Sequence, residues 1–166
     1  MLLELKQLFQ IEGTRLEINT DFDWSDKDLG GICPFTSPVK VRGEIFNRTG
    51  LVTLTMTVDF VYSAPCDRCG TQTELGYSMK FDHLLVSALE GEDEGEYLVL
   101  DGYSLDLDEL AFSDVLLNLP AKHLCNENCK GLCPQCGVNL NVSQCSCKTD
   151  DVDPRLAVLK KLLEED

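Results

Sequence analysis

The fold of this chain is decided by residues 52–82, VTLTMTVDFVYSAPCDRCGTQTELGYSMKFD. In the first half, apolar residues alternate with threonines and an aspartate, which is the side-chain period of a half-buried β-strand. The apolar positions on its buried face are Val52, Leu54, Met56, Val58, Phe60 and Tyr62. The same alternation resumes after Gly70 and continues to Asp82. We therefore predict a β-hairpin that carries a Cys-x-x-Cys pair at its tip.

A further strand is expected immediately upstream, over residues 39–50, because it has the same period and ends in the turn sequence Asn-Arg-Thr-Gly. Its apolar face consists of Val39, Val41 and Ile45. The first forty residues are less regular. Leu16 and Ile18 indicate another strand, and the glycines and prolines around Cys33 indicate a loop.

Downstream of the hairpin, residues 90–96 hold five acidic residues and two glycines, which is typical of a solvated loop. Residues 97–100 predict a short strand. A helix is expected to begin at Asp106, which is a good N-cap, and to end before Pro120. Its apolar stripe consists of Leu107, Leu110, Ala111, Val115 and Leu116.

These elements predict an α+β fold, with an antiparallel β-sheet core, short helices and a Cys-rich zinc-binding segment. A length of 166 residues suits a single domain, residues 1–166. Within it we expect a β-rich core with one helix over 39–118, a cysteine-rich zinc module over 119–148 and a C-terminal helix over 153–164. The last helix has an apolar stripe, which either docks on the chain's own core or binds a partner.

The charge balance narrows the classes of partner. With 14 basic and 29 acidic residues the net charge is -15, which disfavours nonspecific binding to a phosphate backbone and favours a basic protein. No run of apolar residues is long enough to span a membrane, and the start of the chain has no export signal. We expect a cytoplasmic protein with no membrane segment and no small-molecule substrate.

Eight of the nine cysteines occur in closely spaced pairs, and in a reducing compartment such pairs indicate metal binding before disulfides. In chain order, the first to fourth pairs are Cys66/Cys69, Cys125/Cys129, Cys133/Cys136 and Cys145/Cys147. Zinc is held in structural sites by four ligands at tetrahedral corners, so that two pairs make one site. All eight cysteines are therefore candidate Zn²⁺ ligands.

The spacing leaves two pairing schemes open. In the first, the third and fourth pairs form one self-contained site, and the second pair reaches back to complete the first pair. In the rival scheme, the first and third pairs share one ion, and the other four cysteines form a separate cluster or stay unused. The first scheme predicts two zinc ions, and the second allows one.

Other chemistry fits the sequence less well. A thioredoxin-like redox pair uses a helix N-terminus, whereas a strand pattern follows Cys69 here. A catalytic zinc keeps one position open for water, whereas eight thiolates can close two sites. We therefore expect no enzyme activity. His123 could replace a cysteine ligand, but a surface or hydrogen-bonded role is expected, and Cys33 is expected to be a free thiol.

Three segments together resemble a known family. They are the strand-CDRCG-strand motif, LPAKHLCNENCKGLCPQCGVNLN at 119–141 and DPRLAVLKKLL at 153–163. Their order and spacing resemble the YceD-like family, the large ribosomal RNA subunit accumulation proteins. The resemblance implies a non-enzymatic role in the accumulation of 23S ribosomal RNA and in biogenesis of the large ribosomal subunit. The metal-ligand role that the resemblance implies transfers most directly to the hairpin pair, Cys66 and Cys69, because some members of the family lack the later cysteines.

The sequence leaves the partner and one alternative function open. Basic residues next to the cysteine pairs could form a local RNA-binding patch, or they could be ordinary solvated charges. These residues are Arg68, Lys122, Lys130 and Lys148. The competing partner is a basic ribosomal protein bound to the acidic surface. The alternative function is a redox-responsive zinc-thiol switch or an interaction protein.

Overall fold

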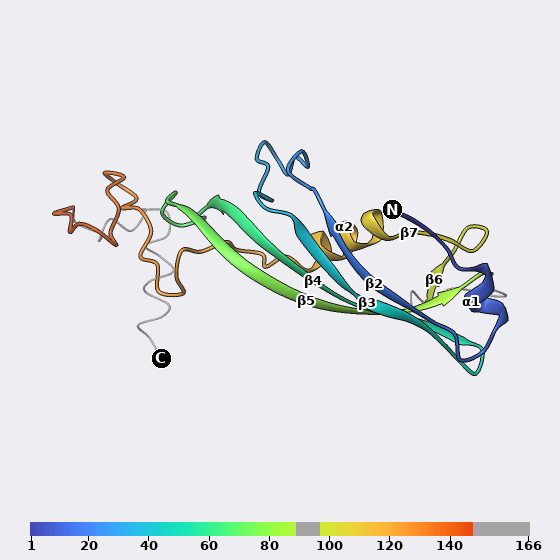
Figure 1. Ribbon diagram of the computed structural model, residues 1–166. Helices are drawn as coiled ribbons and strands as arrows, with labels where there is room; N and C mark the ends of the chain where they lie inside the picture. Colours follow the sequence, from blue (N-terminus) through green and yellow to red (C-terminus); the bar gives the residue numbers. More distant parts are fainter. Residues whose placement is uncertain (89–96, 148–166) are drawn as a thin grey trace, which may run out of the picture.

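The structure is a computed structural model that describes residues 1–88 and 97–147. In these ranges the chain forms two β-sheets and two helices (Figure 1). The elements are β1 (Leu2–Glu4), α1 (Lys6–Gln10), β2 (Arg15–Phe22), β3 (Val39–Arg48), β4 (Leu51–Pro65), β5 (Gln72–Val86), β6 (Tyr97–Val99), β7 (Ser104–Asp106) and α2 (Leu107–Asn118).

The larger sheet has the strand order β2-β3-β4-β5-β6. Neighbouring strands from β2 to β5 are antiparallel, and only β6 lies parallel to its neighbour. The two long strands β4 and β5 form the predicted hairpin, which pairs from Val52↔Leu85 to Pro65↔Gln72. The second sheet pairs β1 with β7, which lie about a hundred residues apart in sequence. The predicted α+β class is confirmed, with a parallel edge strand added to the antiparallel core.

The tight turn between β3 and β4 has the backbone geometry that the strands require. Thr49 and Gly50 both have positive φ, 51° and 86°, as a two-residue type I′ hairpin turn demands. Asn47, at the end of β3, is fully buried. Its amide nitrogen donates to the carbonyl of Leu8 at 2.7 Å, and its amide oxygen accepts from Gly50 N at 3.0 Å. The buried asparagine thus joins this turn to α1.

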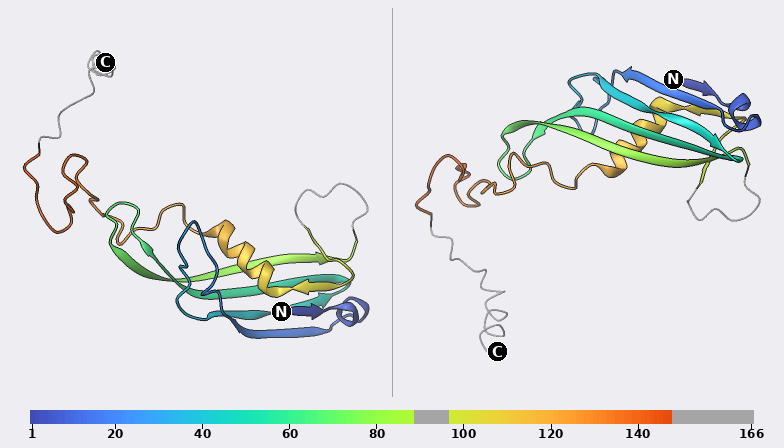
Figure 2. Two further views of the ribbon diagram at one scale, coloured as in Figure 1. Left: turned by 90° about the horizontal axis from the view of Figure 1, so that it is seen from above. Right: turned by 60° about the horizontal axis from the view of Figure 1, so that its bottom comes forward.

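Helix α2 covers one face of the larger sheet (Figure 2). The face is the one that the alternation predicted, since every second residue of β4 from Val52 to Phe60 is buried. The helix contributes Leu107, Ala111 and Val115, each 0% exposed. Its N-cap is Asp106, as predicted, whose carboxylate accepts hydrogen bonds from the backbone of the first turn.

A tryptophan that the sequence did not single out lies at the centre of an aromatic cluster. Trp24 is 0% exposed and makes edge contacts with Phe35 and Phe112, with ring centroids 5.1 Å apart in both cases. Its indole N–H donates to Asp108 at 2.6 Å. These contacts fix the loop between β2 and β3 against α2, although that loop has no regular secondary structure of its own beyond an isolated bridge at Phe35.

The segment 119–147 follows α2 and runs to the tip of the β4–β5 hairpin and past it (Figures 1 and 2). It contains no helix or extended strand. The C-terminal helix expected over 153–164 and the acidic loop expected over 90–96 lie outside the described residues. Within the described part of the chain, no helix has the length and apolar character needed to cross a membrane.

Candidate metal centre

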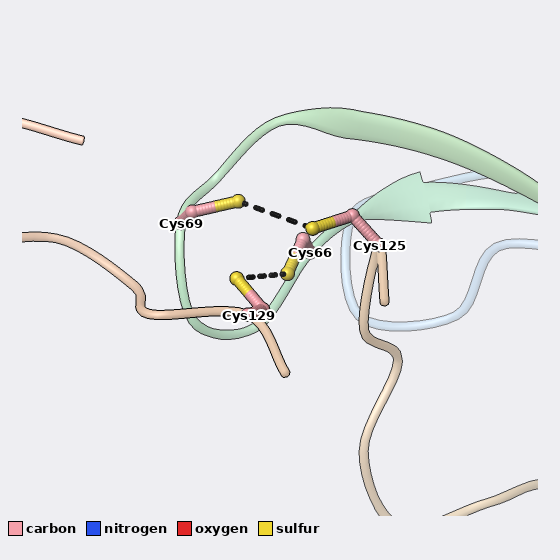
Figure 3. Close-up of side chains that lie close together, drawn as sticks. All are labelled: Cys66, Cys69, Cys125 and Cys129. Atoms are coloured by element: carbon pink, nitrogen blue, oxygen red, sulfur yellow. Dashed lines mark hydrogen bonds between the residues drawn. The ribbon is translucent and has the colours of Figure 1, made fainter. Parts of the chain in front are cut away.

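Four cysteine sulfurs converge where the hairpin tip meets the segment 119–147 (Figure 3). Cys66 and Cys69 come from the turn after β4, and Cys125 and Cys129 come from the segment that follows α2. The Cys66 and Cys129 sulfurs are 3.8 Å apart, and those of Cys69 and Cys125 are 3.7 Å apart. All four lie within 4.8 Å of one another. We call this quartet the first centre.

The sulfur separations fit a tetrahedral metal ion. A Zn–S bond of about 2.3 Å places the sulfurs of an ideal tetrahedron about 3.8 Å apart. Sulfurs joined in a disulfide would be about 2.05 Å apart, and all nine cysteines are free. Three of the four residues are buried, namely Cys66, Cys69 and Cys129. The first centre thus has the donor type, spacing and shielding of a closed four-thiolate site.

The turn that carries the first pair is folded by its own backbone. Cys66 N donates to the carbonyl of Thr71 at 2.9 Å, and Gly70 N donates to the carbonyl of Cys66 at 2.8 Å. Gly70 has a φ of 69°, a conformation that glycine adopts without strain. This tight loop leaves the sulfurs of Cys66 and Cys69 on the same side, toward Cys125 and Cys129.

Hydrogen bonds divide the thiols of the first centre into more and less acidic groups. The Cys125 backbone N–H, the largest influence, lowers the pKa of Cys66 to about 6. The Thr71 hydroxyl and backbone N–H lower the pKa of Cys69. In contrast, the contact of Cys125 with the Cys129 side chain raises the pKa of Cys125 to about 12. Four sulfurs this close cannot all ionise without a counter-charge, which a divalent cation would supply.

A second quartet lies further along the same segment. The sulfurs of Cys133, Cys136, Cys145 and Cys147 also lie within 4.8 Å of one another, and we call them the second centre. Cys133 is 2% exposed, but Cys136 is an exposed residue and the other two are half-buried. The second centre is therefore more accessible to solvent and to reagents than the first.

The second centre repeats the turn of the first. Cys133 N donates to the carbonyl of Val138, and Gly137 N donates to the carbonyl of Cys133, both at 2.9 Å. Gly137 has a φ of 74°. The backbone N–H of Cys136 is the largest influence that lowers the pKa of Cys133 to about 6. The same five-residue pattern, Cys-x-x-Cys-Gly, thus forms the same turn at two places in the chain.

Backbone contacts clip the segment 119–147 to the hairpin tip. Asp67 N donates to the carbonyl of His123 at 2.9 Å, and His123 N donates to the Asp67 carboxylate at 2.7 Å. The Arg68 guanidinium donates to the carbonyl of Cys129 at 2.9 Å. Gly131 passes so close that a Cβ there would lie 2.9 Å from the carbonyl oxygen of Arg68. The protein itself therefore holds the two halves of the first centre together.

Two asparagines between the third and fourth pairs connect the centres. The Asn141 side chain donates from Nδ2 to the Cys129 sulfur at 3.3 Å and accepts from Lys130 N at 2.8 Å. The Asn139 side chain donates to the Thr71 hydroxyl at 3.4 Å, and that hydroxyl lies 3.3 Å from the Cys69 sulfur. The loop of the second centre thus forms part of the outer shell of the first.

The structure groups the cysteines as the first pairing scheme expected, and these two quartets are the only groups in residues 1–88 and 97–147 whose side chains could together hold a metal ion. His123 is not in either quartet; it is buried and its Nε2 lies 3.2 Å from the carbonyl of Thr73. Cys33 is exposed and lies apart from both. Of the basic residues near the pairs, Arg68 is engaged by backbone carbonyls, and Lys148 lies outside the described residues.

Comparisons with known proteins bear on the same residues. A family described as "Large ribosomal RNA subunit accumulation protein YceD" matches residues 54–163. Protein YlbN of Bacillus subtilis is 29% identical over 164 residues, which covers 97% of this chain and 91% of YlbN. A maize protein named "Large ribosomal RNA subunit accumulation protein YCED homolog 1, chloroplastic" is 30% identical, covering 75% of this chain and 53% of its own length. No solved structure is significantly similar to the chain.

Proposed function

Because this chain belongs to the YceD family of large ribosomal RNA subunit accumulation proteins, we propose that it is a non-enzymatic zinc protein that promotes accumulation of 23S ribosomal RNA and biogenesis of the large ribosomal subunit. It acts in the cytoplasm as a binding module. The observation that carries the proposal is the family match over residues 54–163, which spans all eight paired cysteines.

Zinc is the proposed ion at both centres. Tetrahedral sets of four sulfurs select zinc or iron, and zinc is the metal of closed structural sites. The first centre would hold its ion through Cys66, Cys69, Cys125 and Cys129. The second would use Cys133, Cys136, Cys145 and Cys147. Bound zinc supplies a cross-link and no reaction, since the protein's own sulfurs fill every tetrahedral corner and leave no place for a substrate or a water.

The cross-link gives the segment 119–147 the rigidity that its sequence does not. This segment has few buried apolar side chains apart from its cysteines, so that its order depends on the ions and on the clip to the hairpin tip. We propose that the rigid unit of hairpin tip, clip and two centres is the surface offered to the partner, which is ribosomal RNA or a basic ribosomal protein.

The proposal is tested by depletion and rescue. Depletion of the protein should lower 23S relative to 16S ribosomal RNA, and the wild-type chain should restore the ratio. The Cys69→Ser variant should restore it poorly, whereas Cys33→Ser, which changes an exposed thiol outside both centres, should restore it fully. A ratio that stays unchanged on depletion would remove the proposal.

A second candidate function, a redox-responsive zinc-thiol switch, is favoured by one observation, the exposure of Cys136 in the second centre. An exposed metal-bound thiolate is accessible to oxidants, whereas the first centre is shielded. Mild peroxide should then release one metal ion at doses that leave the first centre loaded. Retention of both ions at those doses would eliminate the switch.

A further inference from the structure

A half-enclosed pocket of about 340 Å³ lies beside the first centre, at the junction of the hairpin with the segment 119–147. Its lining residues include Tyr62, Tyr77, Pro65, Asp67, Pro120 and His123. We propose that this pocket binds an arginine side chain of a basic protein partner. This proposal specifies the partner of the function given above. It rests on that function only for the identity of the partner as a ribosomal protein.

The pocket carries a negative charge that no cation of the described chain neutralises. Asp67 is exposed, and one of its carboxylate oxygens accepts the backbone N–H of His123. Among the described residues, no lysine, arginine or histidine forms an ion pair with it. The neighbouring Arg68 directs its guanidinium to main-chain carbonyls instead. The carboxylate is therefore available to a cation from outside.

Aromatic rings form another wall. The rings of Tyr62 and Tyr77 lie 6.4 Å apart between centroids, at an angle of 83°. Within the described part of the chain, neither hydroxyl makes a hydrogen bond. Tyr62 and Asp67 both line the pocket. Burial raises the pKa of both tyrosines, and the Asp67 charge further raises the pKa of Tyr62. Ring faces next to a carboxylate are suited to a planar cation.

His123 adds an acceptor that lacks a donor. Its Nε2 faces the carbonyl of Thr73, which can only accept, so in the neutral imidazole Nε2 carries the proton and Nδ1 presents a lone pair. Nδ1 is buried and has no hydrogen-bond partner among the described residues. A buried acceptor without a donor is unfavourable. The His123 ring lines the pocket, but its Nδ1 is enclosed, so a donor from a ligand would reach it only after the ring turned toward the pocket.

Guanidinium fits this combination better than the other common ligand groups. It is planar, always charged and carries five N–H donors, so it can stack on a tyrosine while it donates to a carboxylate. A lysine ammonium offers charge without a stacking plane, and a nucleobase brings no charge to pair with Asp67. The net charge of -15 would attract a basic protein, and over the same distance it would repel a phosphate backbone.

In the test, two blocked peptides are titrated separately into the zinc-loaded full chain, and binding is followed by NMR. The peptides are glycine-arginine-glycine and its citrulline analogue. Citrulline keeps the shape of arginine and loses its charge. We expect saturable shifts at Tyr62, Tyr77 and His123 with the arginine peptide, and about fivefold or greater weakening with citrulline. Equal binding of both peptides, or shifts only at other residues, would overturn the proposal.

Variants locate the site on the protein. Asp67→Asn keeps an acceptor for the His123 N–H but removes the charge, and it should weaken the arginine peptide as citrulline does. Asp26→Asn makes the same charge change at an exposed residue that does not line the pocket and should leave binding unchanged. Tyr77→Leu provides a second variant, which removes the ring face while keeping an apolar side chain and should also weaken binding. Zinc content and thermal unfolding of each variant confirm that it is folded.

The outcomes separate this inference from the proposed function. If Asp67→Asn binds the arginine peptide normally while depletion still lowers 23S ribosomal RNA, the pocket assignment is wrong and the function stands. If a single-stranded oligonucleotide displaces the arginine peptide and binds more tightly than it, the occupant is RNA and the proposal is overturned. If the pocket binds arginine but depletion leaves the RNA ratio unchanged, the function fails instead.

Discussion

At the scale of single residues, Asn141 joins the two centres through one side chain. Its amide nitrogen donates to the Cys129 sulfur and its amide oxygen accepts from Lys130 N, so it both stabilises a thiolate ligand and fixes the loop that carries it. Asn141→Ala should weaken metal binding at the first centre by about tenfold, the usual effect of losing such an outer-shell partner. Competition with a chelator measures the loss.

Val142 provides the matched control, because it is the next residue and its side chain is 82% exposed. Val142→Ala should retain both ions as tightly as the wild type. Cadmium NMR of the protein in which cadmium replaces zinc can show which centre is affected, since each four-thiolate centre gives its own cadmium resonance. If Asn141→Ala changes only the resonance of the second centre, the link between the centres is wrong.

His83 is predicted to make unfolding depend on pH. The Nε2 atom of His83 lies 2.7 Å from the Asp114 carboxylate. This hydrogen bond raises the pKa of His83 above its ordinary 6.5, although burial has the opposite effect. The negative charge of Asp82 makes a smaller contribution in the same upward direction. Since the folded protein holds the proton more tightly than the unfolded chain, the stabilisation is complete below about pH 6.5 and is lost as pH rises through the raised value.

Urea unfolding of the zinc-loaded protein over this pH range measures that dependence. His83→Gln keeps a hydrogen-bonding side chain but cannot gain a charge, so its unfolding free energy should change less with pH than that of the wild type above pH 6.5. Parallel curves for the two proteins would contradict the assignment to His83.

At the scale of the elements, the sheet has one position where the strands approach too closely for a side chain. Gly43 in β3 pairs with Met56, and a Cβ at Gly43 would lie 2.1 Å from the carbonyl oxygen of Thr55. Gly43→Ala should therefore lower the unfolding free energy by about 3 kcal/mol, at the upper end of overpacking costs. Thermal unfolding measures the change.

Gly76 in β5 is the matched control for Gly43→Ala. It is a strand glycine of the same sheet, and a Cβ there meets nothing within 4 Å. Gly76→Ala should leave stability within about 0.5 kcal/mol of the wild type. If both variants unfold at the same temperature, the close approach of β3 and β4 does not constrain position 43.

The sequence predicted the elements whose signals are local. Alternation identified the β4–β5 hairpin, and a capping aspartate identified the start of α2. It did not predict α1, which has only five residues and no side-chain cap, or β1, whose partner β7 lies about a hundred residues further along the chain. Trp24 was missed because it lies in a loop, where no periodicity marks a buried residue.

At the scale of the whole molecule, the sulfur quartets and the hydrophobic core are separate sources of order. The core consists of sheet, loop and helix residues, whereas the buried cysteines of the first centre form a cluster of their own. A strong chelator should therefore remove hydrogen-exchange protection from residues 119–147 while most of the protection in β3, β4 and β5 remains. Global loss of protection would contradict this separation.

The sequence predicted the eight cysteines that form the two quartets, but it did not predict the residues that support them. All eight cysteines were identified from their spacing, yet spacing alone could not exclude the rival pairing, because the fold decides which distant pairs meet. The Asn-x-Asn pattern at 139 and 141 was a signal available between the third and fourth pairs. No sequence signal marked the contact between Asp67 and His123, since these two residues are 56 positions apart in the chain.

Native mass spectrometry of the purified full chain tests the central claim most directly. The two quartets predict two zinc ions per chain. Cys69→Ser, in the buried first centre, should reduce that number to one, and so should Cys136→Ser in the second. A wild-type chain that carries no metal, or that still carries two ions after both substitutions are combined, would contradict the account.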